Sequence, residues 1–399
     1  MKFNLITKPL SSIADIQTGP FGSQLHKEDY VQIGTPIVTV EHLGGKKFSE
    51  QNLPCVSDKD KERLSKYVLV EGDIVFSRVG SVDRCSYVSL EYAGWMFSGR
   101  CLRVRPSDEI DSQYLYYYFT LETTKQFVRG IATGATMPSI NTKFMGEIPI
   151  TYPPLDIQKR IAELLSLIDN KIEMNNQINN NLEQQAQALF KAWFLDYYPW
   201  NGEVPAKWTY GKLGDYTDIK RGGSPRPIQE FLSDTGLRWL KISDVTSLQT
   251  PFVIEIKEHI IEEGLRKTVF LKAGSLVLSN SATPGIPKIL DVDSCIHDGW
   301  LYFPRSKFSN EYLYLYFKYI RQQLVNLSNG SVFNNLKTDI LRAYPTVLPD
   351  DDTLQRFDDV IKPIFVQIQN LTRESHMLSE LRDSILPKLM SGELDVSNL

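Results

Sequence analysis

Apolar residues recur at helical spacing along two long stretches of the chain. Steps of four and three alternate from Ile161 to Trp193 in the first stretch, and from Ile361 to Leu389 in the second. A sustained heptad pattern is typical of helices that pair along an apolar seam. The sequence offers each helix no other heptad partner, so we expect the two to pack against each other, with a kink at Pro363.

Polar residues interrupt both seams near their middles. Asn175 and Asn179 lie in the first seam, and Ser375 lies in the second. A buried Asn weakens a coiled coil but fixes its register. The run "NNQINNN" at 175–181 also suits a docking face for another protein or an ordinary solvated helix face, and the sequence leaves these alternatives open.

Short runs typical of strands fill the segment before each helix. They are rich in β-branched and apolar residues and are bounded by Gly, Pro and Ser. The clearest runs are "TPIVTV" at 35–40, "GDIVFS" at 72–77, "LRWLKI" at 237–242 and "GSLVLS" at 274–279. Each segment therefore predicts a globule of mixed strands and helices.

Two aromatic stretches, "QYLYYYF" at 113–119 and "EYLYLYF" at 311–317, predict one further helix in each globule. Their apolar residues fall at i, i+1, i+4 and i+5, which is one face of a helix. Aromatic stripes at this spacing usually pack inward, so we expect core helices and not base-stacking surfaces. The face consists of Tyr114, Leu115, Tyr118 and Phe119 in the first copy and Tyr312, Leu313, Tyr316 and Phe317 in the second.

The aromatic stretches belong to a correspondence that runs along the whole chain at a spacing of roughly 200 residues. "LSSIADIQTG" from Leu10 matches "LGDYTDIKRG" from Leu213, "LVEGDIVFSR" from Leu69 matches "LKAGSLVLSN" from Leu271, and the segment from Gly134 matches that from Gly330. Collinear matches of this kind indicate an ancient tandem duplication.

The predicted fold is α+β, with two tandem mixed α/β domains separated by two long helices. We expect the helices to pack as an antiparallel coiled coil with pseudo-two-fold symmetry. The expected boundaries are 1–152 for the first domain, 153–197 for the central helix, 198–349 for the second domain, and 350–399 for the distal helix and a short tail.

Composition excludes several classes of protein. The four cysteines and five histidines are dispersed, so the sequence predicts buried reduced thiols and neither a zinc site, a disulfide framework nor another metal centre. No apolar run has the length of a signal peptide or a membrane helix, and we expect a cytoplasmic protein.

The distribution of charged residues is compatible with a nucleic-acid partner but does not require one. The formal net charge is -4, but the acidic excess lies mostly in residues 350–399, and residues 1–150 are balanced. An unaided nucleic-acid binder usually has a clear basic excess. If DNA is the ligand, we expect a second protein to share the phosphate contacts.

The chain lacks the common catalytic motifs. It has no phosphate-binding Gly-x-x-x-x-Gly-Lys loop, no glycine-rich methyl-donor loop and no Asn/Asp-Pro-Pro-aromatic motif. Asp244, Glu255 and Lys257 resemble an acid followed by Glu-x-Lys on strands, which can hold a hydrolytic magnesium ion. Such triplets are common by chance and the first copy has no equivalent, so we expect no catalysis by this chain.

The paired helices suggest a geometry for binding DNA. A helix from about Asp156 to Trp193 is ~57 Å long at 1.5 Å per residue and can hold two globules apart. Two globules on a pseudo-two-fold axis match the symmetry of duplex DNA. Because the copies differ in their loops, the expected target is bipartite and asymmetric, with a fixed gap.

The chain resembles the specificity subunits of type I restriction-modification systems along essentially its whole length. The resemblance is carried by "TGPFGSQLHKEDY" at 18–30, "GDIVFSRVGS" at 72–81, "INTKFMGEIPITYPPLDIQKRIAELLSLIDNKIEMN" at 140–175, "LFKAWFLDY" at 189–197 and "LRDSILPKLMSGELDV" at 381–396. The second copy departs from the first at "PDDDTLQ", which stands where "PPLDIQ" does.

The resemblance implies two target-recognition domains and two conserved helices that act as a ruler. It implies binding of double-stranded DNA and of two DNA methyltransferase subunits, with motor-nuclease restriction subunits completing the complex. No cofactor is expected on this chain, because S-adenosylmethionine, ATP and magnesium would be held by the partners. The helices that would bind the partners are marked by Ile161, Ile168, Asn175, Leu182 and Leu189 and by Ile368, Leu371, Leu378 and Ile385.

Candidate base-reading residues are Arg, Lys, Asn, Gln, Ser and Thr on Gly-rich loops at matched positions of the two copies, because these side chains pair with base edges. Any one of them could equally be an ordinary turn residue or surface charge. In the first copy they are Ser23, Gln24, Arg78, Arg84, Thr136, Asn141 and Lys143; in the second they are Arg221, Ser224, Arg226, Asn280, Lys288, Asn334, Asn335 and Lys337.

A protein-protein scaffold is the alternative function. In that case the duplicated globules would grip two copies of one protein, and the helices would be a spacer. The near-neutral charge favours a scaffold, whereas the unequal loops favour DNA recognition, because identical ligands would keep both binding surfaces alike.

Overall fold

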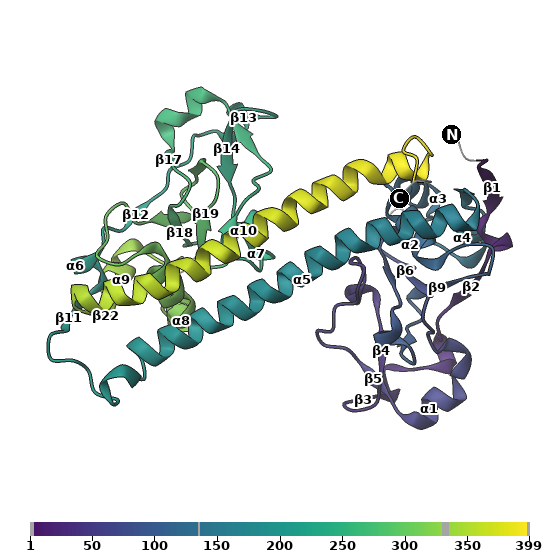
Figure 1. The fold of residues 1–399 in the computed structure, drawn as a ribbon, viewed down its shortest axis with the longest axis horizontal. Coiled ribbons are helices and arrows are strands. Elements are labelled where there is room, and N and C mark those ends of the chain that lie inside the picture. Colours follow the sequence, from purple (N-terminus) through teal and green to yellow (C-terminus); the bar gives the residue numbers. More distant parts are fainter. Residues whose placement is uncertain (1–3, 135, 329–334, 397–399) are drawn as a thin grey trace. The chain divides into compact units, whose positions relative to one another are not determined.

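The computed structural model describes residues 4–134, 136–328 and 335–396. The chain forms two compact units. Unit 1 comprises Met1–Asn170 and Leu378–Leu399, and unit 2 comprises Lys171–Met377. Two helices of 40 residues, α5 (Leu155–Phe194) and α10 (Asp351–Met390), each contribute one part to unit 1 and the other part to unit 2 (Figure 1).

The described residues of unit 1 form two sheets of four strands and one strand pair. Strand β6 (Ile74–Ser77) is buried along its whole length, as its continuous apolar run Ile-Val-Phe predicts for a central strand. The first sheet has the order β2 (Ala14–Thr18), β9 (Cys101–Pro106), β6 (Ile74–Ser77), β7 (Cys85–Tyr87), the second has the order β3 (Tyr30–Val31), β5 (Cys55–Val56), β4 (Thr35–Val38), β8 (Met96–Phe97), and the pair is β1 (Ile6–Pro9) with β10 (Pro149–Tyr152).

Unit 2 repeats this plan with one added strand in each sheet. The first sheet has the order β12 (Lys220–Arg221), β21 (Trp300–Tyr302), β18 (Leu276–Ser279), β19 (Pro287–Leu290), β15 (Phe252–Val253), the second has the order β13 (Leu232–Ser233), β16 (His259–Ile260), β14 (Leu237–Leu240), β20 (Ser294–Ile296), β17 (Val269–Leu271), and the pair is β11 (Thr209–Lys212) with β22 (Pro345–Leu348). The corresponding strand order confirms the predicted duplication.

The aromatic stretches form helices inside both units, as predicted. Helix α2 (Ser112–Thr120) packs against β7 and β9, and α8 (Asn310–Ser328) packs against β18 and β19. Burial extends beyond the single predicted face, because Tyr116 and Tyr117 in unit 1 and Tyr314 and Leu315 in unit 2 are buried as well. Helices surrounded by apolar neighbours are buried all round. Tyr118 is only half-buried, and its hydroxyl donates to the carbonyl of Pro149 at 3.2 Å.

Short helices complete the two units. In unit 1 they are α1 (Asp58–Arg63), α3 (Glu122–Ile131) and α4 (Thr142–Gly146), and in unit 2 they are α6 (Leu213–Tyr216), α7 (Ser243–Thr246) and α9 (Thr338–Arg342). All four cysteines carry free thiols, and three are buried as predicted, whereas Cys55 is half-buried.

Within each unit, α5 and α10 run antiparallel. In unit 2, Asn175 and Asn179 of α5 donate to Glu374 and Thr372 of α10, at 2.8 and 3.2 Å, so the partner number falls as the α5 number rises. The Phe194 ring then lies 4.7 Å from the Phe357 ring, centroid to centroid. These contacts confirm the predicted antiparallel pairing. Helix α10 continues through Pro363 without interruption.

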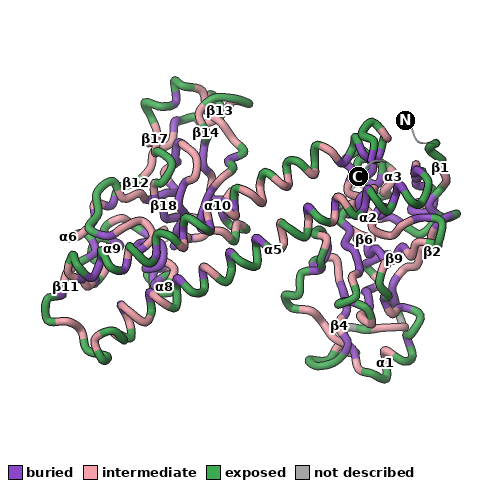
Figure 2. Tube along the Cα trace, viewed as in Figure 1, coloured by how far each residue is buried: buried purple, intermediate pink, exposed green. Residues whose placement is uncertain are grey.

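The predicted seam is largely the buried one. Ile161, Leu165 and Ile168 of unit 1 and Asn175 and Asn179 of unit 2 are buried, with exposed residues between them (Figure 2). In the unit 2 part of α5, three buried residues fall outside the predicted seam, Glu183, Phe190 and Phe194, because the core of unit 2 covers a wider strip of the helix.

Candidate nucleic-acid interface

Four loops of unit 1 meet at one junction, which we call the loop junction of unit 1. It consists of residues 19–24, 78–84, 98–100 and 136–143. The amide of Gly19 donates to the carbonyl of Cys101 at 3.2 Å, the amide of Arg78 donates to that of Arg100 at 2.8 Å, and the amide of Ile140 donates to that of Arg78 at 3.0 Å. Sequence-distant loops are thereby held together by backbone bonds.

Unit 2 has a corresponding loop junction, formed by residues 222–228, 280–286, 297–299 and 335–337. Gly222 donates to Trp300 at 2.9 Å, Asn280 to Gly299 at 2.9 Å, and Leu336 to Asn280 at 2.8 Å, all through backbone groups. A Cβ atom on Gly19 or Gly222 would lie 2.2 Å from the carbonyl oxygen of Ser98 or His297. Only glycine permits this close approach.

The structure brings Arg78 and two residues that were not predicted into one contact. The Arg78 Nη1 donates to the carbonyl of Gly99 at 3.0 Å, and the guanidinium lies 5.8 Å from the centre of the Phe21 ring. Phe21 is 60% exposed, which is unusual for an aromatic ring without a partner molecule. A cation beside an exposed aromatic ring suits both stacking on bases and contact with their edges.

The other predicted residues of unit 1 differ in exposure and in the bonds they make. Thr136 and Lys143 are exposed, whereas Gln24 accepts a hydrogen bond from the Tyr67 hydroxyl at 2.7 Å. Asn141 caps α4, because its Oδ1 accepts from the amide of Phe144 at 2.9 Å, which is the ordinary turn role. Arg84 is exposed and donates to the carbonyl of Leu43. Ser23 lies on a 3₁₀ turn.

In unit 2, three predicted residues converge on the carboxylate of Asp298. Ser224 Oγ donates to Oδ1 at 2.8 Å, while Arg226 Nη2 lies 3.1 Å and Arg221 Nη2 lies 3.9 Å from Oδ2. Burial alone would raise the pKa of Asp298, but the Ser224 bond and the two guanidinium charges hold that pKa below its ordinary value. The carboxylate is therefore charged at neutral pH.

Two predictions in unit 2 need correction. Lys288 lies in β19 and not on a loop, and its Nζ donates to the carbonyls of Leu248, at 2.7 Å, and Thr250. It is only 4% exposed, so its side chain is engaged inside unit 2 and is not open to a DNA base. Asn280 is also buried, and its Nδ2 donates to the Asp298 carbonyl at 3.3 Å.

The remaining described candidates of unit 2 lie just before α9. Lys337 is exposed immediately before the helix, and Asn335 is half-buried. Asn334 lies outside the described residues.

A pocket of about 770 Å³ adjoins the loop junction of unit 2, with Pro225, Ile228 and Ile242 among its apolar walls and Arg226 and His297 at its border. Burial lowers the pKa of His297, so its ring is neutral at pH 7.

Sequence reasoning missed Asp298, Phe21 and Gly99. A signal was present, because aligning "FSGRC" at 97–101 with "IHDGW" at 296–300 sets Gly99 opposite Asp298. The structure supports this alignment, since the carbonyls of Gly99 and Asp298 accept from the side chains of Arg78 and Asn280, respectively.

The residues predicted to mark the partner-binding helices are buried or half-buried within their own units. Ile161, Ile168, Asn175 and Ile368 are buried, as residues of the predicted seam should be. Leu182, Leu189, Leu371, Leu378 and Ile385 are half-buried. Surfaces that remain open in unit 2 include Met174, Ile178 and Val366, which are exposed apolar residues on α5 and α10.

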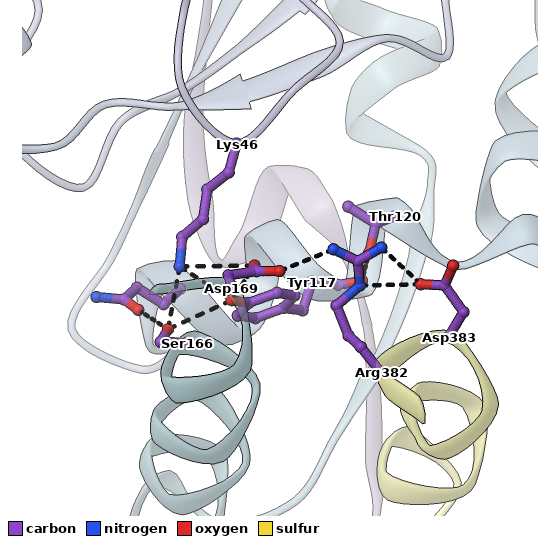
Figure 3. A network of polar contacts seen from close by, with 8 residues as sticks. Lys46, Tyr117, Thr120, Ser166, Asp169, Arg382 and Asp383 are labelled. Carbon is purple, nitrogen blue, oxygen red and sulfur yellow. Dashed lines mark hydrogen bonds and ion pairs between the residues drawn. The ribbon is translucent and has the colours of Figure 1, made fainter. Parts of the chain in front are cut away.

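In unit 1, a polar network joins both long helices to the globular domain (Figure 3). Asp169 of α5 accepts from the Tyr117 hydroxyl at 2.6 Å and from Arg382 of α10 at 2.8 Å, and Lys46 Nζ lies 3.8 Å away. Lys46 also donates to the hydroxyls of Tyr117 and Ser166. The network fixes the domain against α5 and α10 in this unit.

The nuclease-like pattern does not assemble on strands. Asp244 lies in α7, where its Oδ2 accepts from the amide of Lys241 at 2.9 Å, and Glu255 and Lys257 lie in the loop between β15 and β16. Among residues 4–134, 136–328 and 335–396, no three His, Cys, Asp or Glu side chains gather as a metal site would require.

A family profile described as type I restriction modification DNA specificity domain matches residues 5–184 and again residues 205–375. The chain belongs to this family. The family gives it a role in DNA recognition within restriction-modification, and the two matches fall on the two copies of the duplication.

Curated relatives agree with this specificity family. The chain is 23% identical over 421 residues to the type I restriction enzyme MjaIX specificity subunit of Methanocaldococcus jannaschii, covering 98% of this chain and 94% of that one. It is 22% identical over 413 residues to the HindI specificity subunit of Haemophilus influenzae, covering 84% and 89%.

A solved structure has the same fold. The type I restriction-modification S subunit from M. genitalium superposes with a TM-score of 0.63 at 15% identity, covering 97% of this chain and 96% of that one. In the described part of the chain, none of the helices combines the length and apolar character needed to span a membrane.

Proposed function

We propose that the chain is the DNA-reading subunit of a type I restriction-modification complex, in which each recognition domain reads one half of an asymmetric bipartite site. The supporting observation is that both units build the same loop junction and fill it with unlike side chains. Arg78 and Phe21 lie over Gly99 in unit 1, whereas Arg221, Ser224 and Arg226 surround Asp298 in unit 2. Because the two junctions share a backbone arrangement but carry different side chains, we expect them to contact different bases.

The long helices set the gap between half-sites and bind two methyltransferase subunits in this proposal. Each helix has 40 residues, or about 60 Å at 1.5 Å per residue, which exceeds the ~34 Å of one DNA turn. Exposed apolar residues such as Met174, Ile178 and Val366 would contact those subunits. S-adenosylmethionine, ATP and magnesium would be held by the methyltransferase and restriction subunits, and the complex would act in the cytoplasm.

Genome-wide mapping of methylated adenines tests the proposal. The chain is co-expressed with its methyltransferase partner in a host that lacks other adenine methylation. We expect one bipartite motif with two unlike halves and a fixed gap. A stable complex that leaves no such motif would instead favour a scaffold that holds two copies of a partner protein.

A further inference from the structure

One acidic residue lies at the centre of the basic loop junction of unit 2. The Asp298 carboxylate contacts Ser224, Arg226 and Arg221, and its backbone carbonyl accepts from Arg221 Nε and from Asn280 Nδ2. Four of the eight residues predicted to read bases in the second copy are thus attached to a single residue. A carboxylate on a DNA-binding face repels phosphates, so its presence calls for a compensating role.

Stability does not supply that role. The side chains of Arg226 and Arg221 are 79% and 51% exposed, and ion pairs this exposed contribute little to the free energy of unfolding. Their effect is on geometry, because an arginine that is held by one carboxylate loses freedom in its long side chain. Arg226 uses one nitrogen on Asp298, so the rest of its planar donor fork remains available for a base edge.

Unit 1 has a different arrangement at the same position. Gly99 stands there, and a Cβ on Gly99 would lie 2.7 Å from the Phe21 Cβ. Phe21 aligns with Ser224 of unit 2, so an aromatic residue adjoins glycine in one unit, whereas a serine hydroxyl donates to a carboxylate in the other. Arg78 is held by a carbonyl and a ring, and no acidic side chain of the described residues pairs with it. The carboxylate is thus specific to one of the two copies.

We propose that Asp298 is a positioning residue that orients Arg226 and Arg221 for base contacts and keeps them from serving as general phosphate contacts. Asp298 thereby sets the specificity of the half-site that unit 2 reads. This inference rests on the proposed function. It predicts that the carboxylate lowers affinity for unrelated DNA while it raises discrimination at one half-site.

The test measures dissociation constants of the full chain, bound to its methyltransferase subunits, at several salt concentrations. Four DNAs are compared. One is an unmethylated duplex that carries the motif found by methylation mapping, two have one half-site of that motif altered, and one is an unrelated duplex. The variants are Asp298→Asn and the control Asp293→Asn, which removes an equal charge from an exposed ion pair with Lys272 in the same unit.

For Asp298→Asn we expect tighter binding of unrelated DNA, a steeper salt dependence, and a loss of about tenfold in discrimination at one half-site only. Asp293→Asn should retain the discrimination of the unaltered chain. Unchanged discrimination in Asp298→Asn, or equal loss at both half-sites, would overturn the inference.

A second variant keeps the test decisive if Asp298→Asn does not fold. Asp298→Glu retains the charge but moves it by one methylene, so discrimination should fall at the same half-site without tighter binding of unrelated DNA. Full discrimination by Asp298→Glu would also overturn the inference. If the unaltered chain discriminates at neither half-site, the proposed function itself fails, which is a separate outcome.

Discussion

Lys288 shows how a single buried charge shapes unit 2. It lies in β19 with its ammonium group donating to the carbonyls of Leu248, at 2.7 Å, and Thr250. Burial, opposed by the charge of Glu183, lowers the pKa of Lys288 from 10.5 to about 8. The two carbonyls belong to the segment between α7 and β15, so Lys288 ties that segment to the sheet.

The lowered pKa predicts a pH dependence of stability. Between about pH 8 and 10.5, the unfolded chain holds a proton on this lysine that the folded chain has lost. The free energy of unfolding should therefore rise across this window, by roughly 2 to 4 kcal/mol relative to Lys288→Met, and should be lowest below pH 8. Denaturant unfolding at each pH measures it.

Lys272→Met is the matched control, because the Lys272 side chain is 75% exposed. Its unfolding free energy should follow that of the unaltered chain across the same pH range. Equal pH profiles for the unaltered chain and Lys288→Met would contradict the account of Lys288.

Asp169 is the other residue on which stability should depend strongly. Its carboxylate is 12% exposed and is the shared counterion of Arg382 and Lys46. Asp169→Asn removes the counterion that these two partly buried cations share and leaves Arg382 with the exposed Asp383, so we expect a loss of about 2 to 4 kcal/mol in the free energy of unfolding of unit 1.

Asp383→Asn provides the comparison for Asp169→Asn. Asp383 also pairs with Arg382, at 2.8 Å, but its side chain is 64% exposed. Its loss should cost below about 1 kcal/mol. Similar costs for the two variants would show that the network in Figure 3 does not stabilise unit 1 through Asp169.

At the scale of elements, the paired helices follow from the heptad pattern. The expected helix from Asp156 to Trp193 is α5, Leu155–Phe194, because apolar spacing and the absence of internal Gly or Pro define a helix locally. The strands were also visible as apolar runs. Strands β15 and β17, with three residues or fewer, could not be distinguished from loops, because their pairing partners decide them.

The buried Asn residues of the seam should lower the free energy of unfolding of unit 2. Among the described residues, the Oδ1 atoms of Asn175 and Asn179 are buried without a hydrogen-bond donor. Thr372, which accepts from Asn179, also donates to the carbonyl of Ile368 at 2.7 Å and so keeps a partner if Asn179 is removed.

Asn179→Leu should therefore raise the free energy of unfolding of unit 2 by roughly 1 kcal/mol, because a buried amide with an unpaired oxygen is replaced by apolar packing. Asn180→Leu, at the neighbouring exposed position, should change it by less than about 0.5 kcal/mol. Thermal unfolding of both variants measures the difference. Destabilisation by Asn179→Leu would show that the amide contributes more than the apolar contact does.

For the whole molecule, the duplication could be predicted from sequence, whereas the site could be predicted only in part. Matched segments roughly 200 residues apart predicted two domains of one plan, and the two units have corresponding strand orders, with one added strand in each sheet of unit 2. The loops around Arg78 and Arg226 were found, because Gly-rich turns and basic residues are local signals. Their partners were not found, since Phe21, Gly99 and Asp298 come from other loops that only the folded chain brings near.

The central claim is that the two units read different halves of one site. Its most direct test maps methylated adenines in cells that carry the unaltered chain, Arg78→Ala or Arg226→Ala, each with the methyltransferase partner. Each variant should relax the motif in one half only, and in opposite halves, with a loss of ~1 to 3 kcal/mol in discrimination at the affected position. Relaxation of the same half by both variants, or of both halves by either one, would contradict the account.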